Sequence, residues 1–234
     1  MALRLVPDRP LDDWQQLVEA VPWMSPRHVT GSAAGPGRPF DRPLPDWART
    51  LRRLLDAATL TPVTVDGAAY EILAWDREDG RRTGWLCPPP PRGARPPAFP
   101  EHAALWSTFG GIVERFNEPD TWLLNENDSL TAPVARHDAS FVHDYTWAWQ
   151  EEGLKIPITP SEWYSISDEA NGNATLCHRE SGEVLLWAPD HAYDHIRPLE
   201  GCPEYTLYRI DRVPDFRYWV ETVAGQWVDA VVLP

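Results

Sequence analysis

The sequence predicts an α+β protein with antiparallel strands in its second half and an N-terminal α/β extension before them. Helical periodicity is clear near both ends of the chain, at residues 12–21 and 215–227. Strand-like runs with Asn-Gly and Ser-Gly turns between them occupy residues 162–210. The expected order is therefore helices, a hairpin, a helix, antiparallel strands and a closing helix.

Two helices are expected in the first sixty residues. Asp12 and Asp13 can cap a short helix, because carboxylates accept hydrogen bonds from the free N–H groups of a first turn. Its apolar residues follow at helical spacing: Trp14, Leu17, Val18 and Val21. After a loop rich in Gly and Pro at 30–43, a second helix is expected to start at Asp46. Its apolar stripe is Trp47, Leu51, Leu54, Leu55 and Ala58.

A hairpin and a proline-rich segment follow. Two strand-like runs at 62–65 and 70–75 flank Asp66-Gly67, a typical two-residue hairpin turn. Residues 88–100 contain seven prolines, which exclude a helix or a sheet interior. This segment is either a linker or a surface loop. As a linker it divides the chain into an extension at 1–87 and a domain at 101–234.

The second half begins with a helix from Pro100 to Phe109, which the pair Gly110-Gly111 ends. Four strands are expected at 162–167, 173–178, 183–187 and 205–210.

Two local features of the second half give sharper expectations. The turn at Asn171-Gly172 requires a positive φ, which Gly and Asn adopt most readily. Asp215 is expected to cap the closing helix, which should bury Trp219, Val223 and Trp227.

The net charge of −14 is unevenly distributed. Residues 1–100 hold 13 basic and 12 acidic side chains, a net of +1, and residues 101–234 hold the remaining 8 and 23, a net of −15. Phosphate contacts need clustered Lys and Arg, so this composition argues against a nucleic-acid partner. It favours attraction to a basic protein.

The three cysteines, Cys87, Cys177 and Cys202, form neither a disulfide framework nor a Cys-x-x-Cys zinc site. A reducing cytoplasm is the simplest setting for them. The first residues contain no apolar signal-peptide core, and no apolar run is long enough to span a membrane. We therefore expect a cytoplasmic protein without a membrane contact.

The most suggestive polar cluster is Asp190, His191, Asp194 and His195. Asp and His four residues apart on a helix could hold a metal ion or act as acid and base in a hydrolase. Alternatively, these are polar turn residues after a strand, and Pro189 and Pro198 argue against a long helix there. No nucleophile elbow, dinucleotide-binding or phosphate-loop motif is present. We expect no catalytic residues, no cofactor and no stoichiometric metal.

Three segments of the second half resemble the SUKH superfamily, which includes Smi/Knr-type regulatory domains and many bacterial immunity proteins. The first runs from Phe99-Pro-Glu-His to Trp106-Ser-Thr-Phe-Gly-Gly111. The second joins Ile166-Ser-Asp-Glu-Ala-Asn-Gly-Asn173 to Thr175-Leu-Cys-His178. The third is Ser181-Gly-Glu-Val-Leu-Leu-Trp187, followed by Asp190-His191. The resemblance covers about residues 97–228.

The resemblance implies an antiparallel sheet wrapped by helices, a protein-binding function and no catalytic residues. An immunity-type protein would occlude a cognate toxin, such as a nuclease or a deaminase, with an acidic surface. Two alternatives remain open: a regulatory interaction domain without a toxin partner, and the metal-dependent hydrolase.

We expect a basic partner to contact acidic residues that lie near turns. The candidates are Glu151, Glu152, Asp168 and Glu169, with Asp190 and Asp194 if they lie on the same side. Trp163 and Tyr193 are candidates for the apolar centre of the contact, because aromatic side chains dominate many interfaces.

Overall fold

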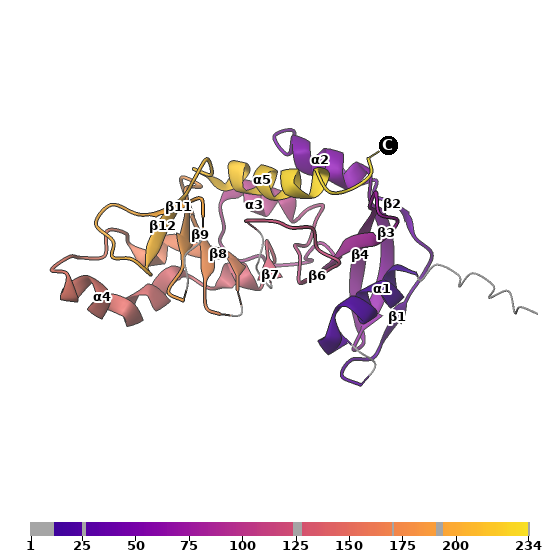
Figure 1. Ribbon diagram of the computed structural model, residues 1–234, viewed down its shortest axis with the longest axis horizontal. Helices are drawn as coiled ribbons and strands as arrows, with labels where there is room; N and C mark the ends of the chain where they lie inside the picture. The colour runs from indigo at the N-terminus through magenta and orange to yellow at the C-terminus, as the bar shows by residue number, and fades with distance from the viewer. Residues whose placement is uncertain (1–11, 25–26, 124–127, 170, 191–193, 234) are drawn as a thin grey trace, which may run out of the picture.

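The computed structural model describes residues 12–24, 27–123, 128–169, 171–190 and 194–233. Its helices and antiparallel strands confirm the α+β class (Figure 1). The strands form two six-stranded sheets, one from each half of the chain.

The first sheet has the order β1-β3-β4-β5-β6, with β2 paired to β3. Its strands are β1 Gly31–Ala33, β2 Arg38–Pro39, β3 Thr59–Val65, β4 Ala68–Asp76, β5 Arg82–Cys87 and β6 Glu114–Phe116. The expected hairpin is β3–β4, and it is confirmed. Asp66 and Gly67 have φ values of +48° and +80°, as a two-residue hairpin turn with two left-handed residues requires.

The second sheet has the order β11-β12-β10-β9-β8-β7. Its strands are β7 Asp128–Ser129, β8 Trp163–Asp168, β9 Ala174–His178, β10 Val184–Trp187, β11 Ile196–Pro198 and β12 Leu207–Ile210. The four strands expected between 162 and 210 are β8, β9, β10 and β12, with ends shifted by one or two residues. Gly172, in the turn between β8 and β9, has a φ of +92°.

Five α-helices and four short 3-10 helices lie among the described residues. The α-helices are α1 Asp13–Ala20, α2 Arg49–Asp56, α3 Pro100–Leu105, α4 Thr146–Glu151 and α5 Phe216–Val228. The 3-10 helices are η1 Pro22–Met24, η2 Val134–Arg136, η3 Ala139–Tyr145 and η4 Pro160–Glu162. Asp215 caps α5 as expected, accepting a 3.1 Å hydrogen bond from the Tyr218 N–H.

Helix α2 begins at Arg49 and not at Asp46, because its cap comes from another helix. The carboxylate of Glu221, in α5, accepts hydrogen bonds from the N–H groups of Thr50 at 2.8 Å and Leu51 at 3.2 Å. These N–H groups belong to the first turn, where no intrahelical acceptor exists. The expected helix at 100–109 is also shorter, since α3 ends at Leu105.

One apolar cluster, here the central core, is built from both sheets and from α2, α3 and α5. Helix α5 runs along the top of the molecule from the second sheet to the first (Figure 1). Its Trp219, Val223 and Trp227 are 0%, 4% and 0% exposed, which confirms the expected buried stripe. The Trp227 ring packs 5.7 Å from Trp75 and 5.1 Å from Trp85 of the first sheet. The closing helix therefore ties the two halves of the chain together.

The proline-rich segment 88–100 does not divide the chain into two separately packed parts. Strand β6, which follows the segment, pairs with β5, which precedes it. The backbone carbonyl of Pro88 lies so close to Gly110 that a Cβ there would be 2.0 Å from it. The predicted boundary between 1–87 and 101–234 is thus crossed by sheet pairing and by the central core, and the segment is a loop on one folded unit.

Each sheet buries a further apolar cluster on the face turned away from the central core. The first outer core lies between the first sheet and α1, and includes Leu17, Met24 and Ile72. The second outer core lies between the second sheet and the segment of η3 and α4, and includes Val142, Trp149 and Trp187. Alternate residues of one strand face opposite sides, so Leu185 joins the second outer core and Leu186 the central core.

None of the helices in the described part of the chain is long and apolar enough to span a membrane. The three cysteines are free.

Candidate functional site

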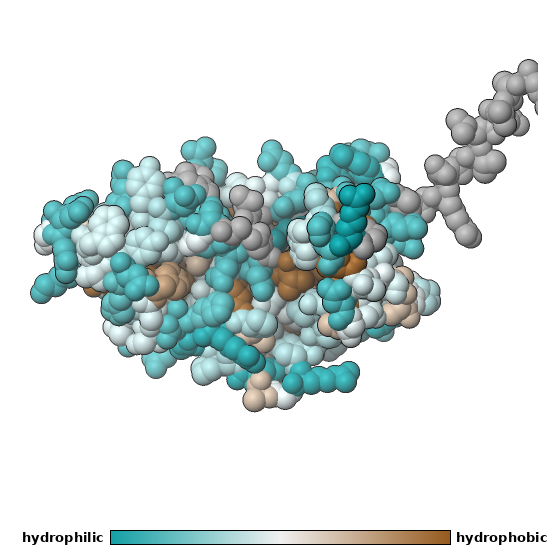
Figure 2. All heavy atoms as spheres, turned by 90° about the horizontal axis from the view of Figure 1, so that it is seen from below, coloured by the Kyte–Doolittle hydropathy of each residue, from teal (hydrophilic) through white to brown (hydrophobic). Residues whose placement is uncertain are grey.

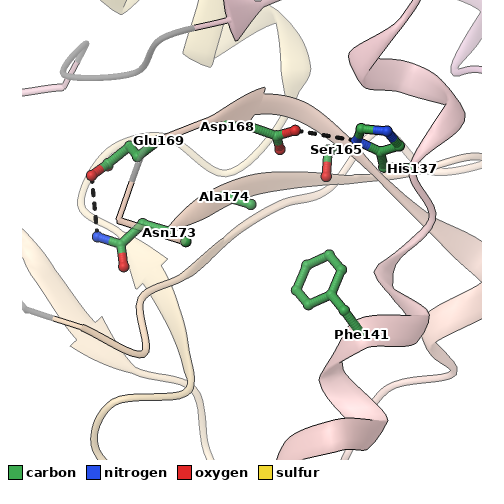
Figure 3. Close-up of a pocket in the computed structure, with 8 residues that line it drawn as sticks. His137, Phe141, Ser165, Asp168, Glu169, Asn173 and Ala174 are labelled. Carbon is green, nitrogen blue, oxygen red and sulfur yellow. Dashed lines mark hydrogen bonds and ion pairs between the residues drawn. The ribbon is translucent and has the colours of Figure 1, made fainter.

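A surface pocket of about 250 Å³ lies where the β8–β9 turn meets η3 (Figure 3). The residues that matter for its chemistry are His137, Phe141, Ser165, Asp168, Glu169 and Asn173. They come from three segments: the end of η2, the middle of η3 and the β8–β9 hairpin. The pocket is therefore created by the packing of η3 on the outer face of the second sheet.

The turn between β8 and β9 is held by its own amide side chains. Asn171 accepts a hydrogen bond from the Asn173 N–H at 3.0 Å and donates one to the Glu169 carboxylate at 3.0 Å. Asn173 donates a further bond to Glu169 at 3.3 Å. Glu169 is only 8% exposed, and its carboxylate accepts these two hydrogen bonds within the turn. The expectation that Glu169 presents its charge to a partner is therefore wrong.

Asp168 pairs with the imidazole of His137 across the pocket rim, with 3.3 Å between Oδ2 and Nδ1. Burial raises the pKa of the Asp168 carboxyl above its usual value, while the His137 bond opposes this rise. Asp128 of β7 lies opposite Asp168 in the neighbouring strand β8. The pKa of Asp128 is also raised, chiefly by burial and in part by the charge of Asp168. This edge of the second sheet therefore holds two crowded carboxyl groups.

Two buried polar side-chain atoms of pocket residues make no hydrogen bond of standard geometry. Asn173 is 1% exposed, and its Oδ1 accepts no bond. Ser165 is also 1% exposed; its Oγ lies near Asp168 and lowers the pKa of that carboxyl, yet makes no bond of standard geometry. Nearly all buried polar groups in native proteins are hydrogen bonded, so these two atoms call for an explanation.

The other predicted partner-binding residues lie in different surroundings. Glu151 and Glu152 are exposed at the end of α4 and do not line the pocket. Trp163 is 4% exposed within the second outer core, so its ring is part of the core and not of a contact surface. Tyr193 lies outside the described residues.

The predicted metal cluster is described only in part, because His191 lies outside the described residues. Asp190 is exposed, and Asp194 and His195 form an exposed turn that leads into β11. The His195 ring packs against Trp122, with 4.9 Å between the ring centroids. Within the described part of the chain, no group of three His, Cys, Asp or Glu residues could hold a metal ion.

A buried pair that sequence reasoning missed joins α3, in the first segment quoted for the family resemblance, to strand β8. His102 of α3 is fully buried, with Nδ1 3.0 Å from the Tyr164 hydroxyl and Nε2 3.0 Å from the Leu130 carbonyl oxygen. Burial lowers the pKa of His102 to about 4, so the ring is neutral near pH 7. Burial also raises the pKa of Tyr164. The pair is enclosed by aromatic rings and serves packing.

Sequence reasoning also missed an exposed tryptophan, since it predicted no helix or strand at residues 112–161. Trp147, on α4, is 55% exposed. Glu151 stands four residues after it on the same helix, a spacing that places side chains together on a helical surface, and the exposed Asp144 lies just before the helix, in η3.

Comparisons of the chain with protein-family models, with curated proteins and with solved structures each found no match. The resemblance to the SUKH superfamily therefore stays a prediction, based on the three segments quoted for it.

Proposed function

We propose that this chain is a protein-binding protein of the immunity type, which neutralises a basic toxin domain of the nuclease or deaminase class by covering it. The observation that carries the proposal is the exposed Trp147 of α4, close in the chain to the exposed acids Glu151 and Glu152, at the end of the molecule formed by α4 (Figure 1). The SUKH resemblance suggests the class of partner. The net charge of −15 in residues 101–234, from 8 basic and 23 acidic side chains, suggests its sign.

The surface around Trp147 combines an apolar anchor with charge. Asp144, Glu151 and Glu152 are exposed close to it in the chain. Figure 2 shows the face below the ribbon of Figure 1, where hydrophilic residues cover most of the surface and apolar residues are visible mainly in recesses. A contact on such a surface depends on isolated aromatic anchors and on charge, because a broad apolar patch is not available on this face.

The two contributions act on different rate constants. The collective field of exposed carboxylates raises the association rate and is screened by salt. A desolvated tryptophan mainly slows dissociation.

The test is stopped-flow kinetics with the toxin domain encoded beside this chain's gene. Raising the ionic strength from low to about 0.5 M should slow association at least roughly tenfold. The double variant Glu151→Arg/Glu152→Arg should lose part of the same rate, and Trp147→Ala should speed dissociation. The matched control is Glu19→Arg/Glu78→Arg, two exposed acids of the first half.

Association that is indifferent to salt and to Glu151→Arg/Glu152→Arg would contradict occlusion by charge. A gene neighbourhood without a toxin, together with binding to a host protein, would favour the regulatory interaction domain. One zinc or manganese ion per purified chain would favour the hydrolase.

A further inference from the structure

We propose that two copies of this chain associate through the open edge of β1, so that their first sheets join into one continuous antiparallel sheet. The partner at this edge is a second copy of the chain. The contact uses none of the residues around Trp147 and goes beyond the proposed function.

Strand β1 is hydrogen bonded to the first sheet along one side only. The Thr30 carbonyl oxygen and the Ala34 N–H each bond to the β3 side at 2.7 Å, on either side of Ser32. In an antiparallel ladder the residues between these three point their N–H and C=O groups the opposite way. The backbone groups of Gly31 and Ala33 therefore face away from the sheet, and no hydrogen bond in the described part of the chain uses them.

This edge differs from the other edge strands of the two sheets in its side chains. Charged residues and proline keep a strand edge from pairing with another chain. The other edge strands carry such residues: Arg38 and Pro39 of β2, Glu114 and Arg115 of β6, Asp128 of β7, and Arg197 and Pro198 of β11. Residues 29–35 contain neither a charged side chain nor a proline, and Ser32 and Ala33 are exposed. The edge of β1 is thus open to pairing.

The edge is complementary to itself. When Ser32 of each copy lies on a twofold axis, Gly31 of one copy stands opposite Ala33 of the other, and each outward N–H meets an outward C=O. Gly31 and Ala33 face the side of the sheet that α1 covers, because a Cβ at Gly31 would lie 2.3 Å from the Trp14 ring. The Ala33 methyl group of the second copy therefore lies beside Trp14, which adds an apolar contact to the backbone bonds.

The distribution of charge favours the same pairing. Residues 1–100 hold 13 basic and 12 acidic side chains, whereas residues 101–234 have a net charge of −15. Strand β1 and helix α4 lie at opposite ends of the molecule (Figure 1). Association through β1 brings the nearly neutral ends together and keeps the acidic halves apart, which limits repulsion. The surface around Trp147 stays accessible in both copies.

The small side chains also decide between a second copy and a foreign strand. A foreign strand that adds to a sheet edge is selected by side-chain pockets, and the small residues at 29–35 form none. A second copy needs only the matching register. The contact is smaller than the roughly 800 Å² per partner of a standard interface, so we expect a dissociation constant on the order of 100 µM.

The first test is sedimentation equilibrium of the full chain. Between about 5 and 500 µM, the native chain should pass from monomer towards dimer. Ala33→Pro removes an N–H that the monomer does not use, and proline is tolerated in edge strands. This variant should weaken the dimer at least about tenfold, because the bond is lost in both copies.

A charge exchange at the twofold axis tests the register without proline. Ser32→Lys and Ser32→Glu should each weaken self-association about five- to tenfold, because like charges then stand opposite each other. An equimolar mixture of the two variants should restore association, which also shows that both are folded. Ala69→Lys is the matched control, since Ala69 is exposed in β4, which lies away from this edge.

A cysteine pair gives an independent test of the same register. Ser32→Cys should form a disulfide between copies under mild oxidation, since residues facing each other across the axis are close enough to be bridged. Ala34→Cys should not, because Ala34 stands opposite Thr30 of the second copy. The native chain is the control for its own free cysteines.

Three results would overturn the inference: a monomer throughout this concentration range, a dimer that is indifferent to Ala33→Pro and to both Ser32 charges, or equal cross-linking of Ser32→Cys and Ala34→Cys. None of these results bears on the proposed function. The rates of toxin binding should be the same for Ala33→Pro as for the native chain, so the two proposals fail separately.

Discussion

Each of the two sheets buries an outer core under a helical segment, but the buried polar side chains of the two sheets differ in how completely they are hydrogen bonded. Under α1, Asp13 is 8% exposed and accepts hydrogen bonds from Thr61 at 3.1 Å and from Arg82 at 2.6 Å. At the β8–β9 hairpin, one polar side-chain atom each of Ser165 and Asn173 makes no hydrogen bond of standard geometry. Buried polar groups in native proteins are nearly always hydrogen bonded, so the first outer face follows the usual pattern and the β8–β9 hairpin departs from it.

The largest expected effect tests whether the two outer faces belong to one cooperative unit. Trp227→Ala should lower the free energy of unfolding by about 3–5 kcal/mol, because it empties the core that both sheets share. Denaturant unfolding followed by far-UV circular dichroism should still give a single transition. Trp147→Ala, at an exposed position, should change the stability by less than about 0.5 kcal/mol. Two separate transitions would show that the sheets unfold independently.

The next effect concerns the inner face of the second sheet, where His102 is fully hydrogen bonded. Its pKa is about 4 in the folded chain against an ordinary 6.5, so the unfolded chain binds more protons between these values. Its contribution to stability is complete above about pH 6.5 and is lost as the pH falls toward 4. The loss is at most roughly 3 kcal/mol, since each pKa unit is worth about 1.4 kcal/mol.

Unfolding midpoints of the native chain and of His102→Gln, compared near neutral pH and in acid, should measure this loss. Burial raises the pKa values of Glu118, Asp128 and Asp168, which has the opposite effect on stability, but these groups are common to both chains and cancel in the difference. Parallel pH dependences of the two chains would contradict a buried neutral His102.

The direct comparison of the outer faces begins with Asp13→Asn. This change removes the charge that Arg82 and Thr61 use, and should cost about 1–3 kcal/mol, the usual worth of a hydrogen bond to a charged group. Urea unfolding provides the measurement. Asp46→Asn is the control, because the Asp46 carboxylate is fully exposed and 3.7 Å from Arg52, so it should cost less than about 0.5 kcal/mol.

The smallest effect is expected on the other face. Ser165→Ala removes a buried hydroxyl that makes no standard hydrogen bond, so the free energy of unfolding should stay within about 0.5 kcal/mol or rise slightly. The same urea experiment applies. If Ser165→Ala lowered the free energy of unfolding as much as Asp13→Asn, the Ser165 hydroxyl would have to be hydrogen bonded in solution. The two faces would then not differ in hydrogen bonding.

The elements that sequence analysis predicted are those with a strong local signal. The hairpin turn at Asp66-Gly67, the strands β8 to β10 and the apolar stripe of α5 were all visible in periodicity and turn residues. Strand β5 was missed because Gly84 interrupts its pattern. The glycine is needed there, since a Cβ would lie 2.4 Å from the Phe116 ring. The short edge strands β1 and β2 were read as a loop, because two or three residues carry no period.

Only some of the residues that line the pocket could be predicted from the sequence. Asp168, Glu169, Asn171 and Gly172 were singled out as a polar turn, which is a local property. His137 and Phe141 reach the same place only because η3 packs on the second sheet, and no spacing along the chain encodes that contact. The expectation of one acidic surface failed at Glu169 for a related reason, since nearby amides bury its carboxylate.

The exposed loop at residues 92–95 has a consequence for how the polypeptide could be divided. It connects β5 to α3 and β6, so a cut there would leave one piece with β1 to β5 and another with the partner strand β6 and helix α5. Each piece alone would expose its share of the central core to water. The two pieces should therefore be unstable apart and reassemble into one particle when mixed, which makes this loop a natural place for a split reporter.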